Sequence, residues 1–172
     1  MFVILMGVSG SGKTTVGQAL AQELGWPFFD GDDYHPQANV AKMAAGIPLD
    51  DQDRAGWLAA LAALLRNGLE RNQQGVIACS ALKESYRQTL RTAAGEPDQV
   101  RFVYLKGDYA TILARMQSRA GHFMKAAMLQ GQFETLEEPG DAITVAITQP
   151  PQDIVHTIRQ WLEHSGHTPG AA

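Results

Sequence analysis

Eight residues near the start of the chain have the types and spacing needed to hold phosphate groups. Residues 7–14 read GVSGSGKT and fit the pattern G-x-x-x-x-G-K-[ST] in full. Glycines let successive backbone N–H groups curl around phosphate oxygens, and the helix that follows presents its positive dipole end. We therefore predict that Lys13 contacts the β- and γ-phosphates of ATP and that the Thr14 hydroxyl ligates Mg²⁺. The residues expected to contact the nucleotide here are Gly7, Val8, Ser9, Gly10, Ser11, Gly12, Lys13, Thr14 and Thr15.

Two aspartates, Asp30 and Asp32, follow the second apolar segment of the chain. We expect this segment to be a strand, and ligands of open α/β sheets bind at the carboxyl ends of the strands. Neighbouring carboxylates repel one another, which is costly unless a cation or a hydroxyl donor uses them. We predict that Asp32 accepts the proton of a substrate hydroxyl and that Asp30 holds Mg²⁺ through water. The alternative is an acidic loop that only caps the next helix.

The elements that must position these residues alternate between strands and helices. Such alternation predicts a parallel sheet with right-handed crossovers and helices on both faces. A buried strand before residues 7–14 and an amphipathic helix after them favour a true phosphate-binding loop over a glycine-rich turn with an incidental lysine. We expect strands over residues 2–6, 26–29, 75–79, 100–105 and 141–147, and helices over 15–24, part of 36–48, 50–71, 82–93, 109–119 and 151–163.

The bulk properties fit one compact α/β domain. The chain has 172 residues, 45% of them hydrophobic, and a formal net charge of −4. A mildly acidic surface argues against nucleic acid or anionic membranes as partners. The single cysteine excludes an intrachain disulfide framework, and no secretory signal or membrane-spanning segment is expected, so we predict a cytoplasmic setting. Residues 1–164 are expected to form a single kinase domain with a lid at about 117–136, followed by a flexible tail over 165–172.

Several sequence blocks resemble those of the bacterial gluconokinases, in family order from the first strand to about residue 150. The resemblance implies a P-loop NTPase fold of the nucleoside-monophosphate-kinase type, with a five-stranded parallel sheet, flanking helices and a lid. It also implies ATP-dependent phosphorylation of D-gluconate to 6-phospho-D-gluconate, and a homodimer. The blocks are FDGDDYHP (29–36), GIPLDDQDR (46–54), CSALK (79–83), YLKGD (104–108), RAGHF (119–123) and QFETLEEP (132–139), together with Asn39, Lys42, Met43, Tyr86 and Arg87.

Gluconate is a polyol with one carboxylate, so its site needs groups that address hydroxyls and at least one cation. Arg54, Lys83 and Arg87 are the candidate cations. Arginine binds a carboxylate in a bidentate manner that lysine cannot reproduce, but the sequence leaves open which of the three does so. His35 and His122 are further substrate candidates that the resemblance favours. The alternatives are ordinary surface cations and partly exposed histidines.

Two arginines lie four residues apart in the helix expected over 109–119. Arg115 and Arg119 therefore share one helix face. In related kinases the lid helix supplies arginines to the phosphates at this point, which implies that Arg119 stabilises transition-state charge and Arg115 contacts the phosphates of ATP. The alternative is a solvated basic helix end that complements the helix dipole.

Other functions share parts of this pattern. GTPases also carry the phosphate loop, but this chain lacks their Asn-Lys-x-Asp signature, and it is short for an ATPase motor. A shikimate kinase would share an Asp-x-Asp pair and a lid, although those enzymes carry a Gly-Gly-Gly run where this chain has Ser-Ala-Leu at 80–82. A nucleoside monophosphate kinase and a non-catalytic ATP-sensing module are the remaining alternatives.

Overall fold

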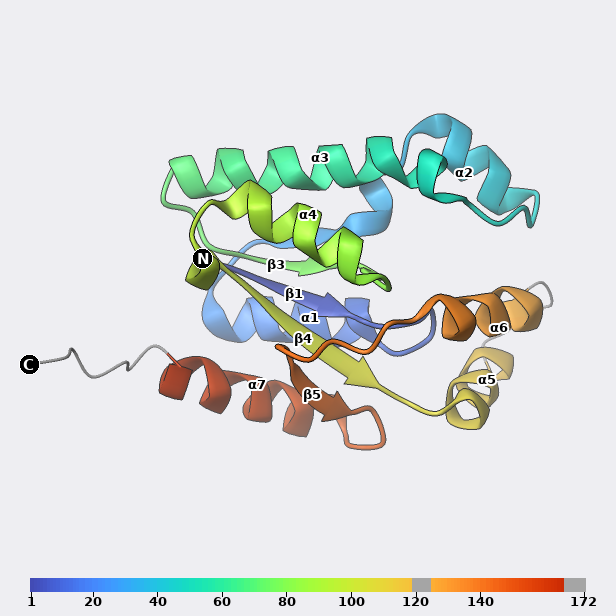
Figure 1. Cartoon of the computed structure of the whole chain (residues 1–172). Helices are drawn as coiled ribbons and strands as arrows, with labels where there is room; N and C mark the ends of the chain where they lie inside the picture. The colour runs from blue at the N-terminus through green and yellow to red at the C-terminus, as the bar shows by residue number, and fades with distance from the viewer. Residues whose placement is uncertain (119–124, 166–172) are drawn as a thin grey trace, which may run out of the picture.

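Within residues 1–118 and 125–165, which the computed structural model describes, the fold is a five-stranded sheet between two layers of helices (Figure 1). The strand order is β2-β3-β1-β4-β5, and each neighbouring pair is parallel. This confirms the predicted P-loop kinase architecture. The strands are β1 (Phe2–Met6), β2 (Phe28–Asp30), β3 (Gly75–Ala78), β4 (Val100–Lys106) and β5 (Ile143–Ala146).

Helices connect these strands and cover both faces of the sheet. In the described ranges none of them has both the length and the apolar character needed to cross a membrane. The α-helices are α1 (Lys13–Leu24), α2 (Gln37–Ala44), α3 (Asp51–Glu70), α4 (Glu84–Ala94), α5 (Tyr109–Gln117), α6 (Lys125–Thr135) and α7 (Pro151–Ser165), and the short 3₁₀ helices are η1 (Gly31–Tyr34) and η2 (Pro97–Gln99).

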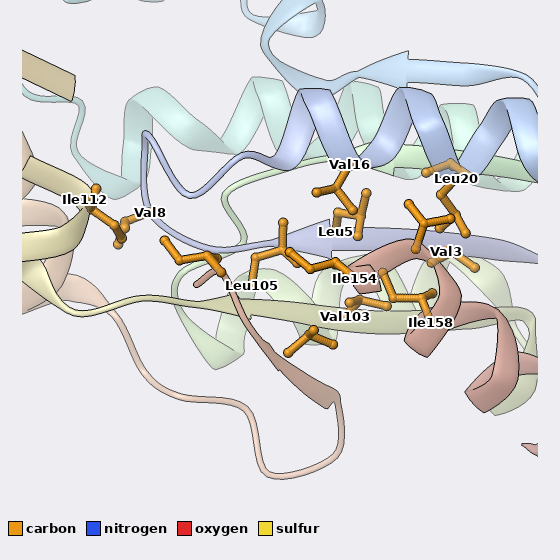
Figure 2. Close-up of a cluster of buried hydrophobic side chains, with 14 of the residues drawn as sticks. Val3, Leu5, Val8, Val16, Leu20, Val103, Leu105, Ile112, Ile154 and Ile158 are labelled. Carbon is orange, nitrogen blue, oxygen red and sulfur yellow. The ribbon is translucent and has the colours of Figure 1, made fainter. Parts of the chain in front are cut away.

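The central strand β1 divides the hydrophobic core into two parts. All five of its residues are buried, as expected for a parallel strand covered on both faces. Alternate side chains point to opposite faces, so Val3 and Leu5 pack with residues of α1 and α7 (Figure 2). Ile4 packs on the other face with α3 and α4, where Trp57 is among the largest buried side chains. Apolar side chains therefore cover both faces of the sheet.

The carboxyl ends of the strands lie at one end of the molecule, together with α2, α5 and α6 (Figure 1). The loops that carry the predicted phosphate and acceptor residues follow β1, β2 and β3 at this end. This is the edge at which α/β sheets bind ligands.

Two of the boundaries that differ from the sequence-based expectations have a clear physical reason. Strand β2 extends through Asp30, whose carboxylate caps η1. Helix α4 begins at Glu84 and not at 82. The chain leading into it is not helical, because Ala81 has a positive φ of 41° and Lys83 is extended at the N-cap. The expected lid region contains the helix α6. The expected flexible tail falls almost wholly on residues 166–172, which lie outside the described residues.

Candidate active site

The phosphate loop connects β1 to α1 and has a backbone shape that requires glycine. Gly7 has φ of +140°, and a Cβ at this position would lie 2.9 Å from the carbonyl oxygen of Leu105. The Lys13 ammonium donates to the carbonyl oxygens of Gly7 and Val8 at 2.9 and 3.0 Å. The loop borders a cavity of about 310 Å³, whose lining residues are Ser9, Gly10, Gly12, Lys13, Thr14, Thr15, Asp30, Asp32, Ala78 and Met116.

Lys13 of the phosphate loop interacts electrostatically with Asp30 and Asp32, at the carboxyl end of β2. Burial lowers the pKa of the Lys13 ammonium, while the nearby acidic groups of Asp32, Cys79 and Asp30 act to raise it. Cys79 itself is buried at the end of β3, and burial raises the pKa of its thiol to about 12. The thiol is therefore neutral at physiological pH, so the charged partners of Lys13 are the two carboxylates.

Thr14 and Asp30 place a hydroxyl and a carboxylate side by side in the lining of the phosphate cavity. The Thr14 hydroxyl donates to Asp30 Oδ2 at 3.0 Å, while Asp30 Oδ1 accepts the backbone N–H of Asp32 at 3.1 Å. Asp30 thus caps η1, which was the alternative to a metal role, and also faces Thr14. Among the described residues no group of three or more His, Cys, Asp or Glu side chains could hold a metal ion. The hydroxyl–carboxylate pair suits Mg²⁺, which binds few protein ligands and keeps water and phosphate oxygens.

A larger cavity, of about 1020 Å³, adjoins the first. Residues from η1, from the loop after α2, from α3, from the loop before α4 and from α6 line it. Ser9, Lys13 and Asp32 line both cavities, so they mark the junction between them. Gly31 permits this arrangement, because a Cβ there would lie 2.6 Å from the carbonyl oxygen of Ala78, and η1 can therefore pass close to the end of β3.

His35 lines the larger cavity and is held by its neighbours. Its ring stacks on Trp57 with a centroid separation of 4.6 Å and an interplanar angle of 9°. The Trp57 indole N–H in turn donates to the carbonyl oxygen of Gly31 at 2.7 Å. Burial lowers the pKa of His35, Arg54 adds to this effect, and Asp32 opposes it. Trp57, a side chain of the buried core, therefore also supports the site.

Two of the three candidate cations border the larger cavity. Arg54 and Lys83 both line it. The Lys83 ammonium donates to both carboxylate oxygens of Asp51 at 2.8 Å, and the hydroxyl of Tyr86 donates to the same carboxylate. These bonds lower the pKa of Asp51, the bond from Lys83 most strongly. Lys83 is thus already paired with a carboxylate, which leaves Arg54 as the candidate better placed to bind an acidic group.

Arg87 requires a correction, because it does not line either cavity. Its side chain is only 1% exposed. The guanidinium donates to the carbonyl oxygens of Ala81 and Leu82 at 2.9 and 3.1 Å and forms an ion pair with Glu84. Arg87 therefore supports the loop between β3 and α4 from inside, and a contact with substrate is not compatible with this burial.

The predicted lid arginines are only partly described. The Arg115 guanidinium donates to the carbonyl oxygen of Ile147, in the loop that follows β5. Arg115 lines neither cavity, although Met116 beside it lines the smaller one. Arg119 and His122 lie outside the described residues, so their predicted contacts stay predictions.

Sequence reasoning missed Gln132 as a functional residue. Its side-chain Oε1 accepts the backbone N–H of Ser9 at 2.6 Å, and the residue lines the larger cavity. Gln132 therefore joins α6 to the phosphate loop at the junction of the two cavities. Asn39 was likewise given no role, although it lies beside His35. Gln132 falls within a resembling block and Asn39 is one of the single residues that share the resemblance, but an uncharged amide carries no chemical signal of its own.

Comparisons with known proteins agree with this geometry. The family model described as "Shikimate kinase" matches residues 9–162. The thermosensitive gluconokinase of Escherichia coli (strain K12) is 54% identical over 136 residues, which cover 79% of this chain and 71% of that protein. The crystal structure of a gluconokinase from Sinorhizobium meliloti 1021 has a TM-score of 0.82 at 41% identity, covering 96% of this chain and 97% of that one. A shikimate kinase from Aquifex aeolicus shares the fold, with a TM-score of 0.58 at 18% identity and coverage of 96% and 98%.

Proposed function

We propose, from the premise that this chain belongs to the gluconokinase family, that it transfers the γ-phosphate of ATP to D-gluconate and forms 6-phospho-D-gluconate and ADP. The observation that carries the proposal is the junction of the two cavities. Ser9, Lys13 and Asp32 border both the phosphate cavity and the larger one, so a donor and an acceptor bound in them would meet at these residues. Holding both reactants together accounts for a large part of the rate of such transfers.

The smaller cavity is the proposed donor site. Backbone N–H groups of the loop and the start of α1 would bind the phosphates of ATP, and Lys13 would move from its carbonyl partners to the β- and γ-phosphates. Thr14 would hold Mg²⁺ directly and Asp30 would hold it through water. When bound, the metal ion would supply positive charge that offsets the negative charge of the phosphates.

The larger cavity is the proposed acceptor site. Asp32 would accept the proton of the substrate 6-hydroxyl while the oxygen of that hydroxyl bonds to the γ-phosphorus of ATP. The bond between the γ-phosphorus and the oxygen that leaves with ADP would break in the same transfer. His35 would address a substrate oxygen, and Arg54 would bind the carboxylate, with Lys83 as a secondary cation. Arg119 is proposed to stabilise transition-state charge, Arg115 to contact ATP and His122 to contact gluconate, in each case from the family resemblance.

Assembly and location form part of the same proposal. The family resemblance supports a homodimer, and the single buried cysteine suits a reducing cytoplasmic setting. Neither a membrane nor a nucleic acid is proposed as a partner, which agrees with the net charge of −4. Sedimentation of the purified protein would give its oligomeric state directly.

A coupled assay of ADP release tests the proposed activity. Purified protein would be given ATP and Mg²⁺ with D-gluconate, shikimate or a nucleoside monophosphate in parallel. We expect gluconate to give the highest kcat/KM by orders of magnitude. Equal or faster turnover of either competitor would contradict the choice of acceptor. Tight ATP binding with no acceptor-dependent ADP release would indicate an ATP-sensing module instead.

A further inference from the structure

Asn39 lies on α2 beside His35, and the residue is only 4% exposed. Its side-chain nitrogen is 2.8 Å from the backbone carbonyl oxygen of Asp53 and 3.3 Å from Nδ1 of His35. Asp53 belongs to the first turn of α3, where it forms a capping box with Asp50. The amide is thus held between α2, α3 and the loop that carries His35.

These two contacts determine which ring nitrogen of His35 carries the proton. A backbone carbonyl oxygen only accepts hydrogen bonds, so the group of Asn39 that faces Asp53 must be its NH₂. The second hydrogen of the same NH₂ is then available to Nδ1 of His35. Nδ1 can accept it only if it carries no proton, so the neutral ring must carry its proton on Nε2.

The rest of the environment favours the same form. The stacked Trp57 ring fixes the plane of the imidazole, and the His35 ring borders the larger cavity. Burial and the nearby Arg54 charge lower the pKa of His35, against the effect of Asp32, so the neutral ring is favoured. A neutral ring with its proton on Nε2 donates one hydrogen bond through that nitrogen.

We propose that Asn39 is a positioning residue that fixes His35 as the Nε2–H tautomer, so that His35 donates a hydrogen bond to an oxygen of the acceptor. The identity of that acceptor as gluconate rests on the proposed function. The matching substrate atom is a carboxylate or hydroxyl oxygen that accepts a hydrogen bond, and not a group that can only donate one.

The ¹⁵N resonances of the His35 ring test the tautomer in the free protein, without any assay of activity. At a pH above the histidine pKa, the wild type should show a protonated Nε2 and an unprotonated Nδ1, with the signals assigned by their loss in His35→Gln. In Asn39→Asp a carboxylate replaces the NH₂ and can only accept, so the proton should move to Nδ1. Asn39→Ala should remove the preference, and Asn67→Asp, at an exposed position of α3, should leave the spectrum unchanged.

Kinetics then test the consequence for the acceptor. We expect Asn39→Ala to raise KM for gluconate about tenfold with a much smaller change in kcat, as for a lost hydrogen bond made equally in ground and transition states. In a His35→Ala background the same change should have no further effect on KM. A wild-type ring protonated on Nδ1, or an unchanged tautomer in both Asn39 variants, would overturn the inference. Absence of gluconate turnover would instead contradict the proposed function and leave the tautomer result standing.

Discussion

Asp32 is the one carboxylate among the three residues that line both cavities. It reaches this position because η1 follows β2 directly and passes close to the end of β3. Asp30, two residues earlier, caps η1 and bonds to Thr14, so the two carboxylates have separate environments despite their proximity in sequence. This separation fits the predicted division between a base and a metal-associated group.

Replacing Asp32 with asparagine should remove the proton acceptor and keep the shape of the side chain. We expect kcat to fall by about 10²–10⁴-fold, the usual contribution of a positioned general base. Asp33→Asn is the matched control, because Asp33 is also exposed but lines neither cavity, and it should leave kcat within about twofold. Steady-state kinetics with gluconate provide the measurement. An increase in KM with normal kcat would reduce Asp32 to a binding residue.

Individual residues differ in how far the sequence could predict them. Lys13 and Thr14 belong to a contiguous motif whose backbone shape is local, so their placement follows from the motif and its flanking elements. Arg87 was misassigned because its burial depends on packing between α4 and the preceding loop, which spacing in sequence does not reveal. Gln132 and Asn39 contact groups from remote segments, so only the folded chain shows what they touch.

Helix α4 carries a buried cation, Arg87, that holds the loop between β3 and α4 in place. Arg87 reaches back from the first turns of α4 to the carbonyl oxygens of residues 81 and 82. Ser80 and Lys83, which precede and follow these two residues in the chain, both border the acceptor cavity. The loop that carries these lining residues therefore takes its shape from an interior contact.

Arg87→Met should destabilise the protein, because it leaves two buried carbonyl oxygens without their donor. We expect a loss of about 2–4 kcal/mol in the free energy of unfolding, measured by urea denaturation. Arg66→Met, on the exposed side of α3, should change it by less than about 0.5 kcal/mol. KM for gluconate, measured well below the unfolding transition, should stay within a few-fold of the wild type. A large rise in KM without loss of stability would restore the original expectation of a substrate contact.

A hydrogen bond of Gln132 links helix α6 to the phosphate loop. Gln132→Ala removes the acceptor of the Ser9 N–H and should lower kcat/KM for gluconate by about tenfold, as expected for one hydrogen bond of about 1.4 kcal/mol. Gln130→Ala is the control on the same helix, since Gln130 is exposed and bonds to Glu134 within the helix. Equal kinetics for the two variants would show that the contact of Gln132 has no part in turnover.

The whole molecule brings together residues that are far apart in the chain. The acceptor cavity draws on segments from Ser9 to Thr135, and its walls meet only because β1, β2 and β3 end at the same edge of the sheet. Alternating strands and helices were enough to predict that sheet, since right-handed crossovers leave few topologies. The relative placement of α2, α3 and α6 around the cavity depends on side-chain packing across long sequence separations, so it could not be predicted in the same way.

Helices α5 and α6, which bound and overlap the predicted lid at about 117–136, border different cavities. Met116 of α5 lines the donor cavity, and Met128, Gly131 and Gln132 of α6 line the acceptor cavity. We expect gluconate and a non-hydrolysable ATP analogue to slow amide hydrogen exchange over 117–136 more strongly together than either does alone, because α5 borders the donor cavity and α6 borders the acceptor cavity.

Mass spectrometry of peptides from that range gives the measurement, with α7 (Pro151–Ser165) as an internal control. Helix α7 packs on the face of the sheet that also carries α1, and none of its residues lines either cavity, so its exchange should not respond to the ligands. Protection confined to the loop at 7–14 with both ligands saturating would contradict the lid, because binding would then order the donor site alone. Protection over 117–136 that requires both ligands would instead connect α5, α6 and the two cavities in one closing step.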